Sequence, residues 1–180
     1  MPLEVNIQED VFQCMCEALA PVLKAQFPAI KSALVGWPDP RLLAEDANFP
    51  SVFFTQVSEK GANVVSRRAV HKIVDNGDGA GDIVREALRL HYLLTITLFT
   101  NTPEDRAAIG WGIKQYLVSN YRLIMADGES AMFHYGGDHQ SEKPGLRRYQ
   151  RDLTFTVQAR VLAATPAVKV TDIVPTFDIK

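Results

Sequence analysis

An unbroken alternation near the C-terminal end constrains the fold of this chain more than any other stretch. Odd-numbered positions there are Tyr149, Arg151, Leu153, Phe155, Val157, Ala159 and Val161. Even-numbered positions are Gln150, Asp152, Thr154, Thr156, Gln158 and Arg160. A period of two predicts a β-strand, which at ~3.3 Å per residue spans roughly 40 Å. Because one face is entirely polar, we expect antiparallel neighbours and helices on the other face only.

The stretch from Leu90 to Leu117 changes from a period of two to a period of about four. Residues 90–100 alternate as a strand in the middle of a sheet does. Thr102 is then a good N-cap and Pro103 suits the first helical turn, so a helix is predicted to begin there. Its apolar stripe is Ile109, Ile113, Tyr116 and Leu117. Gly110 and Gly112 cost this helix about 1 kcal/mol each relative to Ala, so we expect close packing around them.

Helical spacing also marks the N-terminal region. Residues 8–26 predict an amphipathic helix that is interrupted near Pro21. Residues 27–50 are rich in proline and predict an irregular connector with a short helical turn at Leu42 to Glu45. Residues 50–58 are rich in β-formers and predict a further strand.

A glycine-dense turn over 76–81 separates two candidate arms, 63–75 and 82–91. This arrangement predicts an extended β-hairpin over 63–91. Its arms carry many charges, so we expect the hairpin to project from the body of the domain. A helix over 82–90 fits the same apolar spacing, and periodicity does not decide between the two.

Shorter elements complete the predicted fold. Residues 121–127 predict a turn and a short strand, 130–135 another strand, and the polar run 136–145 an exposed loop. Residues 166–180 alternate weakly and predict an extended C-terminal arm. The resulting class is α+β: one domain over 1–180 with a mixed, mostly antiparallel sheet flanked by helices on one face.

Composition limits the classes of function. With 47% hydrophobic residues, 22% charged residues and a formal net charge of −2, the chain has no overall attraction to nucleic acid or membranes. Cys14 and Cys16 are the two cysteines, and we interpret them as small core residues in a reducing compartment. No apolar run reaches ~18 residues and no secretory leader is evident, so we expect synthesis in the cytosol without membrane insertion.

Two groups of residues are candidate metal sites. The acidic run with Asp75, Asp78 and Asp82 has Ala80 where a calcium loop requires its glycine, so a hairpin turn is preferred. The other group consists of His134, Asp138 and His139, together with His71 or His91. Their spacing in the sequence is not that of a structural zinc site, so we expect these side chains to be solvated. We therefore predict no catalytic residue, metal or cofactor.

Basic residues form two groups. Arg67, Arg68, Lys72 and Arg85 lie on the hairpin, and Arg147, Arg148 and Arg151 lie before and within the long strand. They are candidates for a subunit interface, where guanidinium groups pair with carboxylates of a neighbour. The alternative is a solvated face.

Two stretches carry a resemblance to a known family. They are Leu93-Leu-Thr-Ile-Thr-Leu-Phe-Thr-Asn-Thr-Pro-Glu-Asp-Arg106 and, after a helix and a variable loop, Arg147-Arg-Tyr-Gln-Arg-Asp-Leu-Thr-Phe-Thr-Val157. From about Pro50 to Val161 the chain resembles the tail terminator, or tail completion, proteins of long-tailed bacteriophages. The resemblance implies a non-enzymatic virion protein that forms a six-membered ring on the tail tube, ends tube growth and joins the tail to the neck.

The same resemblance implies a set of partners. They are further copies of the chain, the tail tube protein, a neck or head-completion protein and, as an open alternative, the tail sheath. DNA would pass through the ring without sequence-specific contact. In that arrangement Gln150, Thr154, Thr156 and Gln158 are candidates to line the lumen. Two other classes remain open: a metal-dependent enzyme acting on small molecules or nucleotides, and a dimeric adaptor domain.

Overall fold

The computed structural model of the chain describes residues 11–38, 40–63, 70–77, 80–125, 128–143 and 148–168. Its elements are α1 (Val11–Gln26), β1 (Ser32–Val35), α2 (Pro40–Ala44), η1 (Asp46–Asn48), β2 (Ser51–Asn63), β3 (Val70–Gly77), β4 (Ala80–Thr100), α3 (Pro103–Ser119), β5 (Arg122–Ile124), β6 (Ser130–Lys143) and β7 (Arg148–Val168). The described strands form a seven-stranded sheet of order β1-β2-β4-β7-β6-β5, with β3 also paired to β4. Only β1 and β2 are parallel, so the predicted α+β class with a mostly antiparallel sheet is confirmed.

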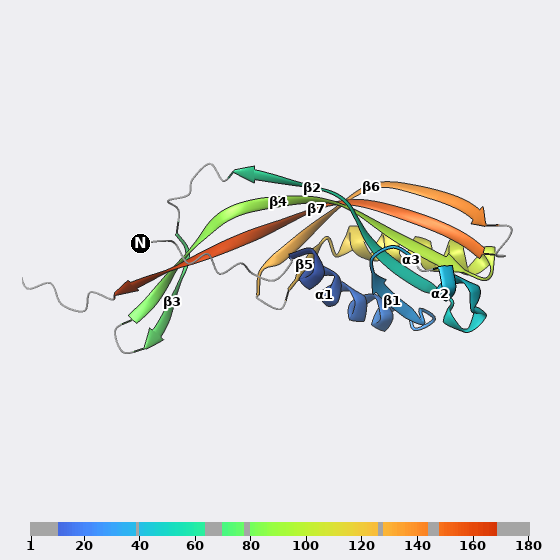
Figure 1. The fold of residues 1–180 in the computed structure, drawn as a ribbon, viewed down its shortest axis with the longest axis horizontal. Helices are drawn as coiled ribbons and strands as arrows, with labels where there is room; N and C mark the ends of the chain where they lie inside the picture. Colours follow the sequence, from blue (N-terminus) through green and yellow to red (C-terminus); the bar gives the residue numbers. More distant parts are fainter. Residues whose placement is uncertain are drawn as a thin grey trace, which may run out of the picture.

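The strands β4 and β7 are neighbours in the centre of the sheet. Each has 21 residues, and they pair from Ala80 with Val168 to Thr100 with Tyr149. At ~3.3 Å per residue each strand is about 70 Å long. Figure 1 shows that one part of this pair lies over the helices and the other part, with β3, extends beyond them. The alternative prediction of a helix over 82–90 is therefore wrong, because this segment is a strand with β-partners on both sides.

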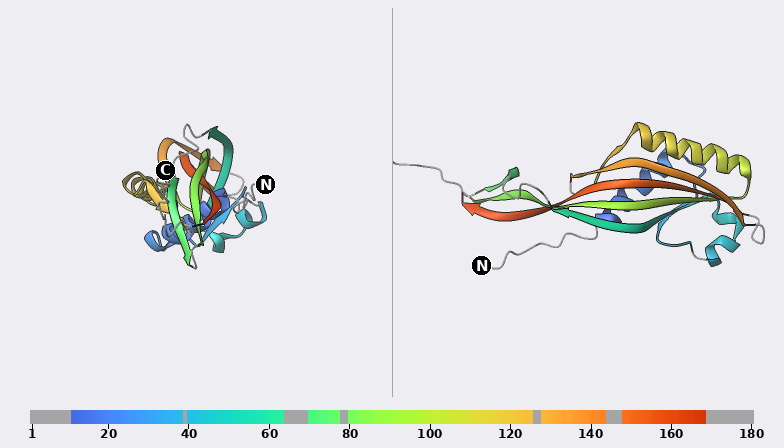
Figure 2. Two further views of the ribbon diagram at one scale, coloured as in Figure 1. Left: turned by 90° about the vertical axis from the view of Figure 1, so that its left-hand side faces the viewer. Right: turned by 90° about the horizontal axis from the view of Figure 1, so that it is seen from above.

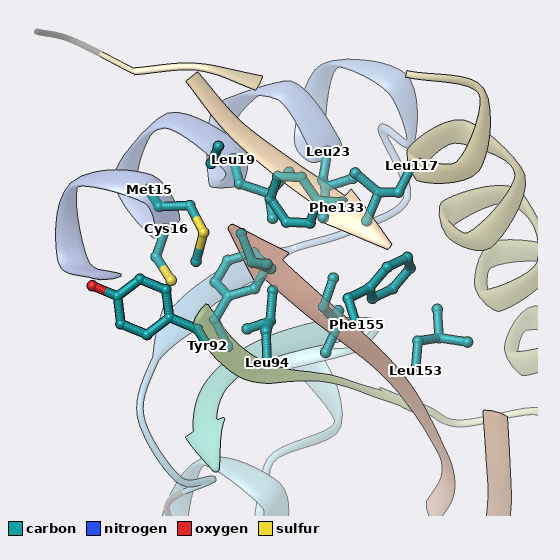
Figure 3. Packing of buried hydrophobic residues seen from close by; sticks show 14 of the residues in the cluster. Met15, Cys16, Leu19, Leu23, Tyr92, Leu94, Leu117, Phe133, Leu153 and Phe155 are labelled. Carbon is teal, nitrogen blue, oxygen red and sulfur yellow. The ribbon is translucent and has the colours of Figure 1, made fainter. Parts of the chain in front are cut away.

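The helices α1 and α3 cover one face of the sheet, as predicted. Figure 3 shows Leu19 and Leu23 of α1 and Leu117 of α3 close to Phe133 and Phe155 of the sheet. All five side chains are buried in one hydrophobic core. Along β7 the odd-numbered positions from 151 to 159 are buried and the even-numbered ones are not, which confirms the predicted assignment of its two faces.

A second, smaller cluster packs elsewhere on the sheet. Its buried members are Leu43, Phe49, Phe53 and Phe99. The rings of Phe53 and Phe99 meet edge to face with centroids 5.9 Å apart. Leu43 belongs to α2 and Phe49 directly follows η1, so this segment packs against the sheet as well. Figure 2 shows α2 at one end of the molecule, away from α3.

Two details of the N-terminal third differ from the prediction, and a third agrees with it. The helix α1 continues through Pro21, because Leu19 and Leu23 on either side are fully buried and packing outweighs the lost hydrogen bond. The region 27–50 contains β1, which pairs with β2 in parallel, so it is more than a connector. The predicted turn near Leu42 is the helix α2, followed by η1.

The loop predicted for 136–145 is also wrong. The strand β6 continues to Lys143, and residues 144 and 145 lie outside the described part. A register shift between Tyr135 and Gly137 accommodates the glycines, and a Cβ on Gly136 would lie 3.3 Å from the Thr154 carbonyl oxygen. Beyond the short β5, the outer side of β6 has no partner strand among the described residues. A strand at an edge is commonly polar, which explains why the composition of this segment predicts a loop.

The start of α3 and its glycines follow the prediction. Thr102 Oγ1 accepts a hydrogen bond from the Asp105 backbone N–H at 3.1 Å. A Cβ on Gly110 would lie 2.4 Å from Arg151 Cδ, and one on Gly112 would lie 2.5 Å from Phe27 Cε1. Both glycines therefore permit close packing, one against the sheet and one against the end of α1.

Part of the predicted hairpin is present, as the antiparallel pair of β3 with residues 80–85 of β4, in which Gly77 pairs with Ala80. Residues 88–91 of its predicted second arm pair instead with β2, to which Asn63 of the first arm belongs. Residues 64–69, 78 and 79 lie outside the described part, as do 169–180 of the predicted C-terminal arm. Residues 166–168 of that arm belong to β7.

Candidate assembly surfaces

Arg151, a predicted interface residue, has its partners inside the subunit. Its Nε donates to Asp138 Oδ1 at 3.0 Å, and its Nη1 donates to the Ala107 carbonyl oxygen of α3 at 3.3 Å. The side chain is 5% exposed and that of Asp138 is 19% exposed. This ion pair joins β6, β7 and α3, because a bidentate guanidinium satisfies the carboxylate and a helix carbonyl together.

Arg148 is also used within the subunit. Its Nη2 lies 2.6 Å from Asp46 Oδ1, and its Nε donates to the Leu43 carbonyl oxygen at 3.2 Å. The guanidinium carbon lies 4.3 Å from the centre of the Phe49 ring. The side chain is 6% exposed, so its main contribution is to hold the segment of α2 and η1 against β7. For Arg148 and Arg151 a role between subunits stays a prediction.

The remaining basic candidates lie toward the hairpin or outside the described residues. Arg67, Arg68 and Arg147 lie outside the described residues. Lys72 lies in β3, where it pairs with Val84 of β4. Arg85 of β4 is half-buried, and its Nε has no hydrogen-bond partner among the described residues. Lys72 and Arg85 therefore belong to the part of the sheet that extends beyond the helices (Figure 1).

The predicted lumen residues share the face of β7 opposite α1 and α3. They are Gln150, Thr154, Thr156 and Gln158, of which Thr156 is exposed and the others are half-buried. The Gln150 amide donates to both carboxylate oxygens of Asp152, at 3.0 and 2.8 Å. Thr156 pairs with Leu93 and His134 on the neighbouring strands. These residues form one polar surface in the middle of the sheet.

The candidate metal ligands are separated in the structure. Asp138 pairs with Arg151, while His134 and His139 are exposed on β6. Within the described ranges no group of three or more His, Cys, Asp or Glu side chains has an arrangement suited to a metal ion. Asp78 of the glycine-rich turn lies outside those ranges.

The body of the sheet ends on one side at β1, and this edge is apolar. Leu34 is 38% exposed, Val35 is 41% exposed and Trp37, just after the strand, is 79% exposed. The Gly36 N–H donates to the Phe54 carbonyl oxygen, and Gly36 has a φ of 109°, so the backbone of this turn is held in place. An exposed tryptophan on an ordered turn is typical of an interface.

The other end of the strand order, β5, also exposes apolar side chains, beside the exposed Arg122. Tyr121 is 53% exposed and Ile124 is 57% exposed. Sequence reasoning missed both edges. The tryptophan between Gly36 and Pro38 was an available signal, whereas the exposure of Ile124 depends on strand order, which periodicity does not give.

Open backbone edges also occur along the extended part of the sheet, which is the part of β4 and β7 that, with β3, reaches beyond the helices (Figure 1). Residues 159–168 of β7 pair with β4, but on the other side no described strand pairs with them, since β6 ends its pairing at Gln158. The outer side of β2 is paired with β1 only from Ser51 to Phe54. Unpaired N–H and C=O groups of this kind are sites where another strand can add.

No family model and no curated protein matches this chain. A solved structure described as the virion of a native gene transfer agent particle is similar with 12% identity and a TM-score of 0.43, covering 84% of this chain and 95% of that chain. A second solved structure is similar with 10% identity and a TM-score of 0.39, covering 84% of this chain and 94% of that chain. At these values neither structure assigns a family or a function to this chain.

One further property concerns membranes. Among the helices of the described residues, none is both long enough and apolar enough to span a bilayer.

Proposed function

We propose that this chain is a structural, non-enzymatic virion protein of a bacteriophage tail that assembles into a ring, most simply of six copies. In this proposal the ring caps the tail tube, ends its polymerisation and forms the joint to the neck. The resemblance of residues 50–161 to tail terminator proteins supplies the class. The two apolar edges of the sheet are the observation that supports self-assembly.

The argument from the edges is geometric. The edge at β1 exposes Trp37 and the edge at β5 exposes Ile124, and these strands stand at opposite ends of the strand order. A surface that binds a different surface of the next copy makes a heterologous contact, and such contacts close into a ring when the rotation permits. A twofold dimer would instead use one self-complementary patch. The presence of two separate apolar edges therefore favours a ring over the dimeric adaptor.

The polar surface with Thr154 and Thr156 fits the lumen of such a ring. It carries hydroxyl and amide groups in the centre of the sheet, on the side without α1 and α3. The neutral side chains of Thr154 and Thr156 bind phosphates weakly, so DNA could move past this part of the surface without being held there.

An experiment can separate a ring from the alternatives. The purified chain is examined by native mass spectrometry and electron microscopy over increasing concentration, alone and with its cognate tail tube protein. We expect six-membered rings and shortened tubes. The double variant Trp37→Ser, Ile124→Ser should remain folded but monomeric, whereas Val57→Ser, at a 53% exposed position on β2, should still form rings. A dimer at every concentration would instead support the adaptor.

A further inference from the structure

A small hollow lies on the polar side of the sheet, near the point where β4 and β7 leave the helix-covered body. It has a volume of about 120 Å³ and is lined by residues of four strands. Arg89 comes from β4, Arg122 from β5, Ser130 from β6, and Gln158 and Arg160 from β7. Cross-strand pairing explains why these residues lie together. Arg89 of β4 pairs with Arg160 of β7. Arg122 of β5 pairs with Met132 of β6, and Met132 pairs with Gln158 of β7. We call this hollow the arginine pocket.

Positive charge exceeds negative charge in the arginine pocket. Glu86 accepts from Arg89 Nε at 2.8 Å and lies 3.7 Å from Arg160 Nε. The hydrogen bond and the charge of Glu86 raise the pKa of Arg89 above its ordinary value. One carboxylate thus serves two guanidinium groups, and Arg122, which is exposed, has no ion pair or hydrogen bond to any described residue.

Neutral donors line the same hollow. The hydroxyl of Ser130 and the side-chain amide of Gln158 are half-buried, and neither makes a hydrogen bond within the described part of the chain. Three guanidinium groups with one carboxylate among them, together with a hydroxyl and an amide that make no hydrogen bond to a described residue, are a set with more donors than acceptors. Such a set is suited to an anion with several strong acceptor oxygens, and planar guanidinium groups bind phosphate oxygens in pairs.

We propose that the arginine pocket binds a phosphate group, with Arg122 as its main uncommitted donor. The phosphate can be free in solution or belong to the backbone of DNA, since both present the same oxygens. Phosphate binding does not depend on the proposed ring, so the two proposals can fail separately.

The first test uses inorganic phosphate and the full chain. Isothermal titration calorimetry at constant ionic strength compares the wild type with Arg122→Gln and with Lys24→Gln. Lys24 is an exposed cation on α1, on the opposite side of the sheet. We expect the wild type and Lys24→Gln to bind equally, and Arg122→Gln to bind about tenfold more weakly, because one charge-assisted contact is lost. Equal binding by Arg122→Gln, or no binding by the wild type, would overturn the proposal.

The second test identifies the source of the phosphate. Fluorescence anisotropy follows a short labelled DNA duplex in the same buffer, with and without competing inorganic phosphate. DNA binding that weakens about tenfold in Arg122→Gln and is displaced by phosphate supports a DNA backbone. Phosphate binding without such DNA binding supports the free ion. If Arg122→Gln changes only the oligomeric mass, the pocket holds a carboxylate of another copy and the proposal is wrong.

Discussion

The same two strands pass through two different environments, and their side chains differ accordingly. Within the helix-covered body, Leu94, Ile96 and Leu98 of β4 are fully buried. In the extended part of β4, residues 81–86 are half-buried except for Val84, and Ile73 on the paired strand β3 is 73% exposed. Strand formation in the extended part therefore depends on backbone pairing more than on a core of its own.

Arginines differ between these regions in the same way. Arg151, in the body, is 5% exposed and holds Asp138 beneath α3. Arg89, near the extended part, is 42% exposed and forms an ion pair with Glu86, which lies three residues earlier on β4 and is 14% exposed. Charge in the body stabilises the fold, whereas charge in the extended part remains accessible to a ligand or a partner. We conclude that the body provides stability and that the extended part leaves more of its side chains exposed.

The largest expected effect tests this comparison on one strand. Ile96→Asp should abolish folding, because an unpaired carboxylate buried in the core costs several kcal/mol and total stabilities are about 5–15 kcal/mol. Ile83→Asp, in the extended part, should cost only about 1 kcal/mol. Circular dichroism and urea unfolding measure both. Loss of folding in Ile83→Asp would mean that the extended part belongs to the cooperative core.

A smaller difference is expected between the two ion pairs. Arg151→Gln should lower the free energy of unfolding by about 3 kcal/mol, since it leaves Asp138 without its buried partner. Arg89→Gln should lower it by less than about 1 kcal/mol, because water screens the 42% exposed Arg89 and because Arg160, 3.7 Å away, remains as a second partner of Glu86. Chemical denaturation of both variants gives the comparison, and equal losses would contradict the assignment of separate roles to the two regions.

Much of the body could be predicted from the sequence, because its patterns are local. The alternation along β7, the N-cap at Thr102 and the apolar stripe of α3 each depend on neighbouring residues alone. The prediction was wrong where tertiary packing decides the outcome. Pro21 remains inside α1 because the core holds both flanks of the helix, and residues 136–143 remain a strand because β7 supplies a partner.

The candidate surfaces were harder to predict, since exposure is a property of the assembled sheet. Arg148 and Arg151 were identified as notable residues, but their partners Asp46 and Asp138 are distant in sequence. The arginine pocket was not predicted at all. Its residues come from four strands, and strand order had to be known before Arg122 could be placed beside Gln158.

The smallest predicted effect concerns the contact that lets α3 approach the sheet, and here the sign of the change is informative. Gly110→Ala should destabilise the protein by about 1 kcal/mol, because the clash with Arg151 Cδ outweighs the better helix propensity of Ala. In an Arg151→Ala background the clash is absent, so Gly110→Ala should stabilise by up to about 1 kcal/mol. A double-mutant cycle measured by urea unfolding gives the coupling energy between the two positions.

The control is Ala108→Gly, at an exposed position of the same helix, which should lower the free energy of unfolding by about 1 kcal/mol in both backgrounds. A stabilising Gly110→Ala in the wild type would mean that Arg151 moves aside readily, and that the body is less tightly packed than its burial indicates.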